Sequence, residues 1–177
     1  MSQRNHCDEL LAILPVMEAG LREPLEGISQ DHLNHRFAPH KMTIGELAVH
    51  CTAWPVYFLS AEPPWAKVRW TCRPCPDPLT MAFVDQAIDE GFAAMRETLQ
   101  RASDEDLDKR SDQERGLGYL ICRLQLHFIW HVGQMSYLRH MLDEAWASSG
   151  RGHFGRMATA YIGVSYHAGD PQRLRGF

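Results

Sequence analysis

Residues 117–142 have the sequence LGYLICRLQLHFIWHVGQMSYLRHML, which carries the longest helical pattern in the chain. One stripe of residues recurs every three or four positions and is apolar apart from two histidines: Leu117, Leu120, Leu124, His127, His131, Met135, Leu138 and Leu142. Because an α-helix has 3.6 residues per turn, this spacing places them on one face. At a rise of 1.5 Å per residue such a helix is about 39 Å long, so it predicts one full-length member of a helical bundle.

Three more apolar stripes of the same period predict three helices on the N-terminal side, over residues 10–28, 44–62 and 81–99. Pro15 and Pro24 lie inside the first stripe. Because proline lacks a backbone donor and crowds the preceding turn, we expect a kink or a late start there. The sequence contains no hairpin pattern and no internal repeat. Four striped helices without a convincing strand predict an all-α protein, specifically a four-helix bundle.

Short motifs predict where two of these helices begin. Thr43-Ile44-Gly45-Glu46 has the spacing of a capping box, in which the hydroxyl accepts from the N–H of Glu46 and the carboxylate accepts from the N–H of Thr43. Thr80 or Asp77 is available to cap the third helix. Gly116 precedes the fourth helix and offers no side chain for a cap, so the sequence does not define where that helix starts.

The segments between the predicted helices differ in composition. Residues 29–42 are polar and predict a loop with a short turn, and residues 103–106 predict a short acidic turn. Residues 63–78 contain five prolines, so we expect a long irregular loop before the third helix that could act as a lid. The domain prediction is a bundle over residues 1–144 and a C-terminal extension over residues 145–177, packed on or near the bundle.

Composition and charge exclude several classes of function. The 177 residues include 18 Lys and Arg against 22 Asp and Glu, a formal net charge of −4, without a basic block. Nucleic-acid binding needs clustered cations that displace counterions, so we expect no nucleic-acid partner. No apolar run reaches the roughly 18 residues of a membrane span, so we expect no membrane association and a cytoplasmic location. Five cysteines, an odd number, indicate reduced thiols.

Ten histidines are the unusual feature of the composition. His127 and His131 are four residues apart, so their rings stand one turn apart on the same face of the fourth helix. His50, in the middle of the second helix, is the natural third ligand. Three imidazoles can bind a divalent metal ion at about 2.0–2.1 Å and leave an open coordination position, as in catalytic zinc sites. The alternative is that His127 and His131 are core residues hydrogen-bonded to neighbouring carbonyls.

Several neighbours of these histidines are candidates for orienting a ligand or lining a pocket. Glu46 lies one turn before His50 and could accept a hydrogen bond from it, or it could serve only as the capping partner of Thr43. Four aromatic residues near the histidines in helical register could line a pocket or belong to the core: Trp54, Tyr57, Trp130 and Tyr137.

Two familiar motifs are not supported by their context. Cys72 and Cys75 have the spacing of a redox pair, but a thioredoxin-type site needs a helix N-terminus after a strand, and no strand is predicted here. The segment His127-Phe128-Ile129-Trp130-His131 has the histidine spacing of zinc peptidases. It lacks the glutamate that serves as general base in the His-Glu-x-x-His motif, so we expect no peptidase of that type.

Two strings in the sequence resemble the DinB/YfiT-like superfamily. They are Thr43-Ile44-Gly45-Glu46-Leu47-Ala48-Val49-His50 and His127-x-x-x-His131-Val132-Gly133-Gln134, within a helical order that matches over residues 10–142. The resemblance implies a four-helix bundle, often a homodimer, that holds one divalent metal ion such as zinc or nickel on three histidines. By position it implies His50, His127 and His131 as ligands, Gly133 for close helix approach and Gln134 as a nearby polar group.

The same resemblance implies a class of reaction. Some members of this superfamily transfer small thiols or isomerise thiol adducts, with the metal activating the thiol. We therefore expect a metal-dependent thiol transferase with a small-molecule substrate and a low-molecular-weight thiol. Two alternatives stay open from the sequence: hydrolysis by metal-activated water, and a non-catalytic stress-response or interaction bundle whose metal stabilises the fold.

Overall fold

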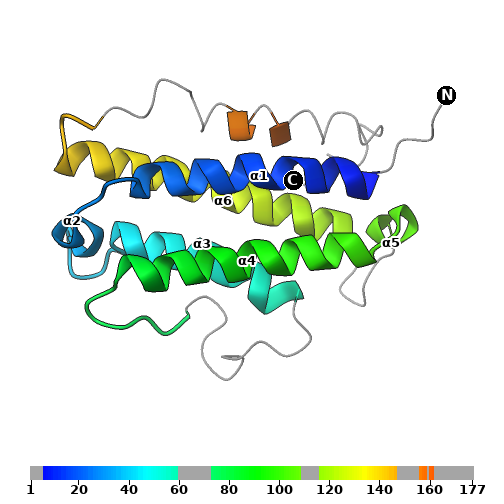
Figure 1. Ribbon diagram of the computed structural model, residues 1–177, viewed down its shortest axis with the longest axis horizontal. Helices are drawn as coiled ribbons and strands as arrows, with labels where there is room; N and C mark the ends of the chain where they lie inside the picture. The colour runs from blue at the N-terminus through cyan, green and yellow to red at the C-terminus, as the bar shows by residue number, and fades with distance from the viewer. Residues whose placement is uncertain (1–5, 60–72, 109–115, 147–155, 159, 162–177) are drawn as a thin grey trace.

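The computed structural model describes residues 6–59, 73–108, 116–146, 156–158 and 160–161 of the chain. Across these ranges the protein is built from helices and contains no strand, so the all-α prediction is confirmed (Figure 1). None of the helices in this part of the chain is long and apolar enough to cross a membrane.

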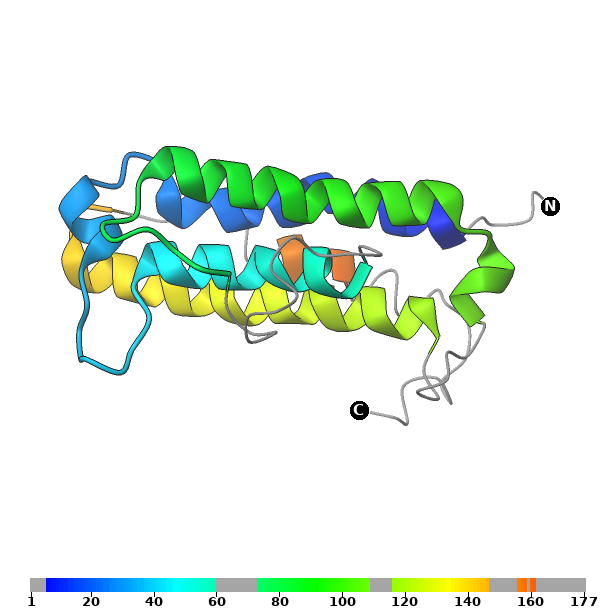
Figure 2. The ribbon, with the colours of Figure 1, turned by 90° about the horizontal axis from the view of Figure 1, so that it is seen from below.

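Four long helices form the body of the molecule: α1 (His6–Arg22), α3 (Ile44–Leu59), α4 (Met81–Arg101) and α6 (Leu117–Leu142). They lie side by side with nearly parallel axes (Figures 1 and 2). α1 contacts α4 and α6, and α3 contacts the same two helices, so the four helices surround one core. Three short helices lie in the connections: η1 (Glu23–Leu25), α2 (Gln30–Asn34) and α5 (Asp104–Asp108).

Apolar side chains from the long helices fill the space between them. Met17 of α1, Ile44 of α3, Phe92 of α4 and Phe128 of α6 are all fully buried or nearly so. Phe92 and Phe128 stack with their ring centroids 5.2 Å apart. Burying a side chain of this size stabilises the folded state by about 1.5–3 kcal/mol relative to leaving it exposed, so this core holds the helices together.

α3 and α4 approach each other closely at one glycine. A Cβ atom at Gly91 would lie 2.7 Å from the backbone oxygen of Thr52, closer than real Cβ atoms come to such an atom. Thr52 is fully buried, and its hydroxyl donates to the carbonyl of Ala48 at 3.0 Å. Glycine at position 91 therefore lets α4 pack against the backbone of α3 only two residues after His50.

The predicted caps are present. The N–H of Glu46 donates to the Thr43 hydroxyl at 3.1 Å, and the N–H of Thr43 donates to the Glu46 carboxylate at 2.8 Å, so the capping box is confirmed. The Thr80 hydroxyl accepts from the N–H of Phe83 at 3.3 Å, which confirms it as the cap of α4. α6 begins directly after Gly116 without a side-chain cap.

The prediction for the first helix was wrong at its C-terminal end. The apolar stripe continues to Ile28, but α1 ends at Arg22. Pro24 lies at the beginning of the 3-10 helix η1, where its missing N–H removes no helical hydrogen bond. Pro15 lies inside α1 and does not delay its start. Proline therefore divides the stripe between two helices.

Two connections contain more helix than predicted. Residues 29–42 include α2, whose N-cap is the Ser29 hydroxyl accepting from the N–H of His32 at 3.1 Å. The predicted acidic turn is the helix α5, and the carboxylate of Asp106 bonds the backbone N–H of Ser103 at 2.9 Å. In both places a serine hydroxyl accepts a hydrogen bond from a backbone N–H group three residues later, which favours the start of a helix.

Two of the predicted segments are described only in part. Most of the predicted loop over residues 63–78 lies outside the described residues, but Arg73 pairs with Glu90 of α4 at 2.6 Å. In the C-terminal extension, Met157 is fully buried. A Cβ atom at Gly20 would lie 2.0 Å from its sulfur, so Met157 packs directly on α1.

Candidate metal centre

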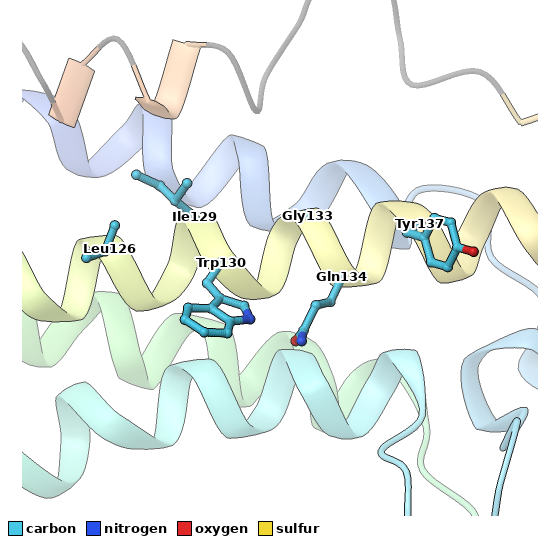
Figure 3. Close-up of a pocket in the computed structure, with 6 residues that line it drawn as sticks. All are labelled: Leu126, Ile129, Trp130, Gly133, Gln134 and Tyr137. Carbon is cyan, nitrogen blue, oxygen red and sulfur yellow. The ribbon is translucent and has the colours of Figure 1, made fainter.

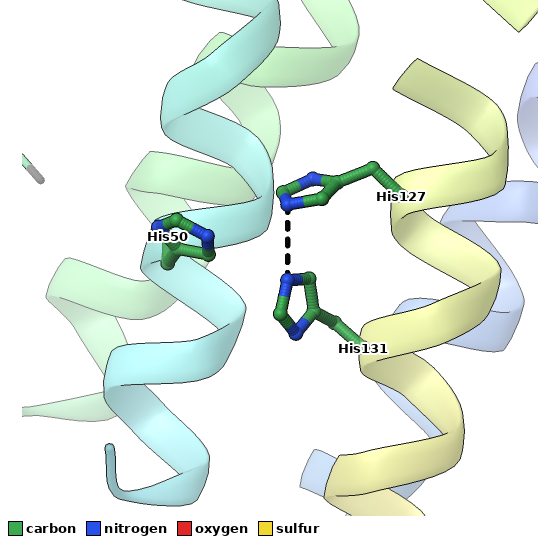
Figure 4. A group of neighbouring side chains, drawn as sticks. All are labelled: His50, His127 and His131. Atoms are coloured by element: carbon green, nitrogen blue, oxygen red, sulfur yellow. Dashed lines mark hydrogen bonds between the residues drawn. The ribbon is translucent and has the colours of Figure 1, made fainter. Parts of the chain in front are cut away.

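Three histidines from two neighbouring helices meet on one side of the bundle (Figure 4). His127 and His131 come from α6, one turn apart, and His50 comes from α3. Each is half-buried, and each offers a ring nitrogen that lies within 4.8 Å of those of the other two. The His50 ring centroid is 5.1 Å from that of His127 and 5.0 Å from that of His131. The structure therefore brings together the three residues that the sequence indicated.

Gln134 determines which nitrogen of His131 faces the cluster. The Nδ1 atom of His131 lies 2.6 Å from the Oε1 atom of Gln134, so Nδ1 carries the hydrogen and donates it. The Nε2 atom of His131 then carries the free lone pair of the neutral ring, and this atom lies 2.9 Å from the Nε2 atom of His127. A second hydrogen bond that fixes the ring and its tautomer is typical of metal-binding histidines.

Both histidines of α6 are held in the neutral form. The pKa of His127 is lowered to about 3, mainly by burial and to a smaller extent by the positive charges of His131, His50 and Arg123. Burial also lowers the pKa of His131, against the opposing effect of its hydrogen bond to Gln134. Because a metal ion binds imidazole through an unprotonated nitrogen, the two rings are ready to act as ligands at neutral pH.

Trp54 forms the wall of the site on the α3 side. Its indole stacks on the His127 ring with centroids 4.1 Å apart and planes inclined by 24°. It also meets the His50 ring edge-on at 5.9 Å and the Phe58 ring at 5.6 Å. This packing restricts the rotation of His127, whose Nδ1 atom is buried and has no hydrogen-bond partner among the described residues.

Two of the three nitrogens have a spacing that fits a divalent metal ion, and the third, from His50, lies within 4.8 Å of them. Two nitrogens bonded to one ion at about 2.0–2.1 Å lie about 2.9–3.4 Å apart, for angles at the ion between about 90° and 109°. The observed 2.9 Å between the Nε2 atoms of His127 and His131 lies at the lower end of that range. An ion bound there would replace the hydrogen bond between the two rings. Three neutral imidazoles form the ligand set of catalytic zinc sites, in which one position stays open.

A comparison with protein families decides the relationship of the chain. The model of the DinB superfamily matches residues 16–135, which is more than half of the sequence. The chain belongs to the DinB superfamily. The match contains His50, His127 and His131, and it confirms the resemblance seen in the sequence. Searches of the curated proteins and of the solved structures found no match.

The DinB-type sequence pattern also suggested neighbours of the ligands, and the structure separates them. Trp54 and Gln134 contact the cluster directly. Glu46 accepts from the N–H of Thr43 and pairs with Arg36 at 2.5 Å, so its two carboxylate oxygens are engaged in the cap. The capping role that the sequence left open is thus present, and no described contact joins Glu46 to His50.

Two aromatic candidates lie farther from the ligands. Tyr57 meets the Phe58 ring edge-on with centroids 5.1 Å apart. Trp130 is 67% exposed on the outside of α6, where it lines a shallow apolar hollow (Figure 3). Gly133 and Gln134 also line this hollow, so the hollow lies beside the metal centre.

Sequence reasoning missed one residue beside this DinB-type site. Arg123 lies one turn before His127 on α6, and its guanidinium carbon is 5.7 Å from the centre of the Trp54 ring. A cation within about 6 Å of an indole is attracted by the negative face of the ring. The signal available in the sequence was the spacing of four residues from His127, which places both side chains on one face of the helix.

Proposed function

We propose that this DinB-superfamily protein is a four-helix bundle that binds one divalent metal ion, zinc or nickel, through His50, His127 and His131. The observation that supports it is the meeting of three imidazoles from α3 and α6, with ligand atoms within 4.8 Å of one another. Imidazole nitrogen suits zinc and nickel among other first-row metals. Two of the ligands are only one turn apart, so the rigid helix α6 sets their spacing.

We further propose that the site activates a small thiol, in a metal-dependent transfer to a small electrophilic substrate. When bound, the ion lowers the pKa of a coordinating thiol or water towards neutrality. The residues of the chain supply the rest: Gln134 holds His131, and Trp54 holds His127 and covers the α3 side of the site. Hydrolysis by activated water is the second candidate reaction, because the same open position accepts water.

Metal analysis of the untagged full-length chain tests the first proposal. We expect about one zinc or nickel ion per chain in the wild type and none in the variant His127→Ala/His131→Ala. The variant His140→Ala is a matched control, because His140 is an exposed histidine on the same helix. If the wild-type protein takes up no stoichiometric metal after incubation with either ion, the proposal is wrong and the histidines serve packing.

Two measurements separate the catalytic proposal from a purely structural metal. A catalytic site should lose thiol-transfer activity in His127→Ala while the protein keeps its helical circular dichroism and most of its stability. A structural site should lose several kcal/mol of unfolding free energy on chelation, because metal binding is then coupled to folding. A metal-loaded protein with no turnover across a panel of thiols and electrophiles would contradict the transferase.

We also propose that the protein is a homodimer that pairs through the outside of α6. Trp130 and Tyr137 are 67% and 66% exposed there, on either side of the hollow at Gly133. A protruding indole next to a hollow on one surface is self-complementary, since a two-fold axis places each indole in the hollow of the other copy. Exposed aromatic residues of this kind are enriched in interfaces.

Light scattering tests the dimer. We expect twice the chain mass of 20.2 kDa for the wild type and the single chain mass for Trp130→Arg. Phe37→Arg is the matched control, because Phe37 is an exposed aromatic residue in the connection between α2 and α3, away from the hollow. A monomeric wild type, or a Trp130→Arg variant that stays dimeric, would reject this interface.

A further inference from the structure

The charges around the candidate metal centre are all of one sign. The three candidate ligands are neutral or positive, and the third positive group that lowers the pKa of His127, after His131 and His50, is Arg123. The cluster of possible metal ligands in the described residues contains no Asp or Glu. A divalent ion on three neutral imidazoles keeps its two positive charges, and Arg123 adds a third. The site with its ion therefore carries an uncompensated positive charge.

Arg123 is held beside the site without an acidic partner. It is exposed, and among the described residues no carboxylate forms an ion pair with it. The guanidinium of Arg123 contacts the Trp54 ring, and the same ring also stacks on the ring of His127. The same indole thus positions a metal ligand and the guanidinium. Arg123 and His127 leave α6 about 6 Å apart along its axis, so the two groups face one small region.

A guanidinium is suited to one kind of ligand group. Its five N–H donors form a planar fork that matches the two oxygens of a carboxylate, and it stays charged at every physiological pH. Other arginines of the chain show this pairing with protein carboxylates, as Arg73 does with Glu90 at 2.6 Å. At Arg123 the described residues supply no such carboxylate, and the Trp54 ring that the guanidinium contacts also stacks on His127.

We propose that the site takes a small molecule with two anionic groups, a thiolate directed at the metal and a carboxylate bound by Arg123. This inference rests on the proposed metal-dependent function and names the class of its thiol. Arg123 is then a specificity-determining residue that distinguishes carboxylated thiols from neutral ones. Trp54 contacts both binding groups, so the indole forms the floor against which the carbon chain of the ligand lies.

The test compares two thiols on the metal-loaded full-length protein by calorimetric titration. The probes are 3-mercaptopropionate, which carries a carboxylate, and 2-mercaptoethanol, which does not. In the wild type we expect the carboxylated thiol to bind about five- to tenfold more tightly, the range for a partly exposed charge-assisted hydrogen bond. The preference should shrink as ionic strength rises, because salt screens exposed charges.

Variants assign the preference to one residue. Arg123→Gln should bind 3-mercaptopropionate as weakly as 2-mercaptoethanol, with its metal content and its affinity for the neutral thiol unchanged. Arg123→Lys should keep part of the preference, because the charge remains and the fork is lost. Arg101→Gln is the matched control, since Arg101 is an exposed arginine at the end of α4, and it should keep the full preference.

Two results would overturn the inference, and they differ from failure of the proposed function. Equal affinity of the wild type for both thiols, or an equal loss for both thiols in Arg123→Gln, would show that Arg123 does not select the carboxylate. A wild-type protein without metal, or one whose metal binds neither thiol, would instead contradict the proposed function itself. Metal content measured on the titrated samples separates the two cases.

Discussion

Two opposite sides of the bundle differ in how their positively charged side chains are paired. Where α1 meets α4, Arg22 forms ion pairs with three carboxylates: Glu18 at 3.0 Å, Asp85 at 2.8 Å and Asp89 at 2.6 Å. Where α3 meets α6, three histidines and Arg123 lie together and no carboxylate of the described residues joins them. On the first side, carboxylates of the chain itself neutralise the arginine. On the second side, the described residues supply no carboxylate, so the positive charge is available to an anionic ligand.

The largest expected effect is a complete loss of bound metal, caused by substitutions on the histidine side but not on the opposite side. His127→Ala/His131→Ala should reduce the metal from about one ion per chain to none, because a single remaining imidazole cannot hold the ion. Arg22→Ala, on the opposite side, should keep about one ion per chain. Elemental analysis of both purified variants measures this. Equal metal in the two variants would break the comparison.

A smaller effect is expected from the residue that positions a ligand. Gln134→Leu removes the acceptor at 2.6 Å from the Nδ1 atom of His131 and frees the ring to change tautomer. Loss of such an outer partner typically weakens metal affinity about 10- to 100-fold. Competition with a chromophoric chelator measures the affinity. Gln134→Glu should restore tight binding, since a carboxylate accepts the same hydrogen bond; failure of this rescue would remove Gln134 from the positioning role.

Substitution of Arg22, on the side with the ion pairs, should change the stability of the protein rather than its metal content. Arg22 is about one third exposed and its partners Asp85 and Asp89 are more exposed still, so solvent screens these ion pairs. We expect Arg22→Ala to lower the free energy of unfolding by about 1 kcal/mol, with a smaller loss at high salt. Urea denaturation at low and at high salt measures it. A loss that does not depend on salt would indicate packing by the arginine stem rather than charge.

A further expected effect is a pH dependence of stability that belongs to the histidine side. In the metal-free protein the pKa of His127 is about 3, below its ordinary value of 6.5, mainly because of burial. As pH falls below 6.5 the unfolded chain binds a proton that the folded chain does not, so stability falls towards pH 3 and the effect ends there. The variant His127→Ala should lose less stability than the wild type between pH 6.5 and 4.

Denaturation in the presence of a chelator checks that pH dependence. The chelator keeps trace metal from holding the imidazoles in place while the pH is lowered. Parallel stability curves for the wild type and His127→Ala would mean that His127 is as easily protonated in the folded protein as in the unfolded chain.

The sequence predicted the fold most accurately where a local pattern determines the structure. The stripe over residues 117–142 coincides with α6, although the glycine before it left the start of that helix undefined, and the capping residues Thr43 and Thr80 gave the starts of α3 and α4. The end of α1 was missed because the same apolar stripe continues into η1, where proline changes the backbone but not the pattern. The apolar stripe determines which side chains are buried, whereas Pro24 determines where the hydrogen bonds of the α-helix end.

The site was predictable only in part, for a related reason. Spacing placed His127 and His131 on one face, but the contact of Arg123 with Trp54 joins two helices and depends on how α3 and α6 are packed. Trp130 lines the hollow on the outside of α6 rather than the face that carries the histidines, because adjacent residues on a helix differ in direction by about 100°.

The stacking of Trp54 on His127 gives the protein an optical reporter of its own metal. The two rings are 4.1 Å apart, so an ion bound through His127 would lie within direct quenching range of the indole. Nickel has an open d shell and quenches indole emission, whereas zinc has a filled d shell and does not. Titration of the metal-free chain with each ion, read in the fluorescence spectrum and compared with Trp54→Phe, would show which ion has arrived.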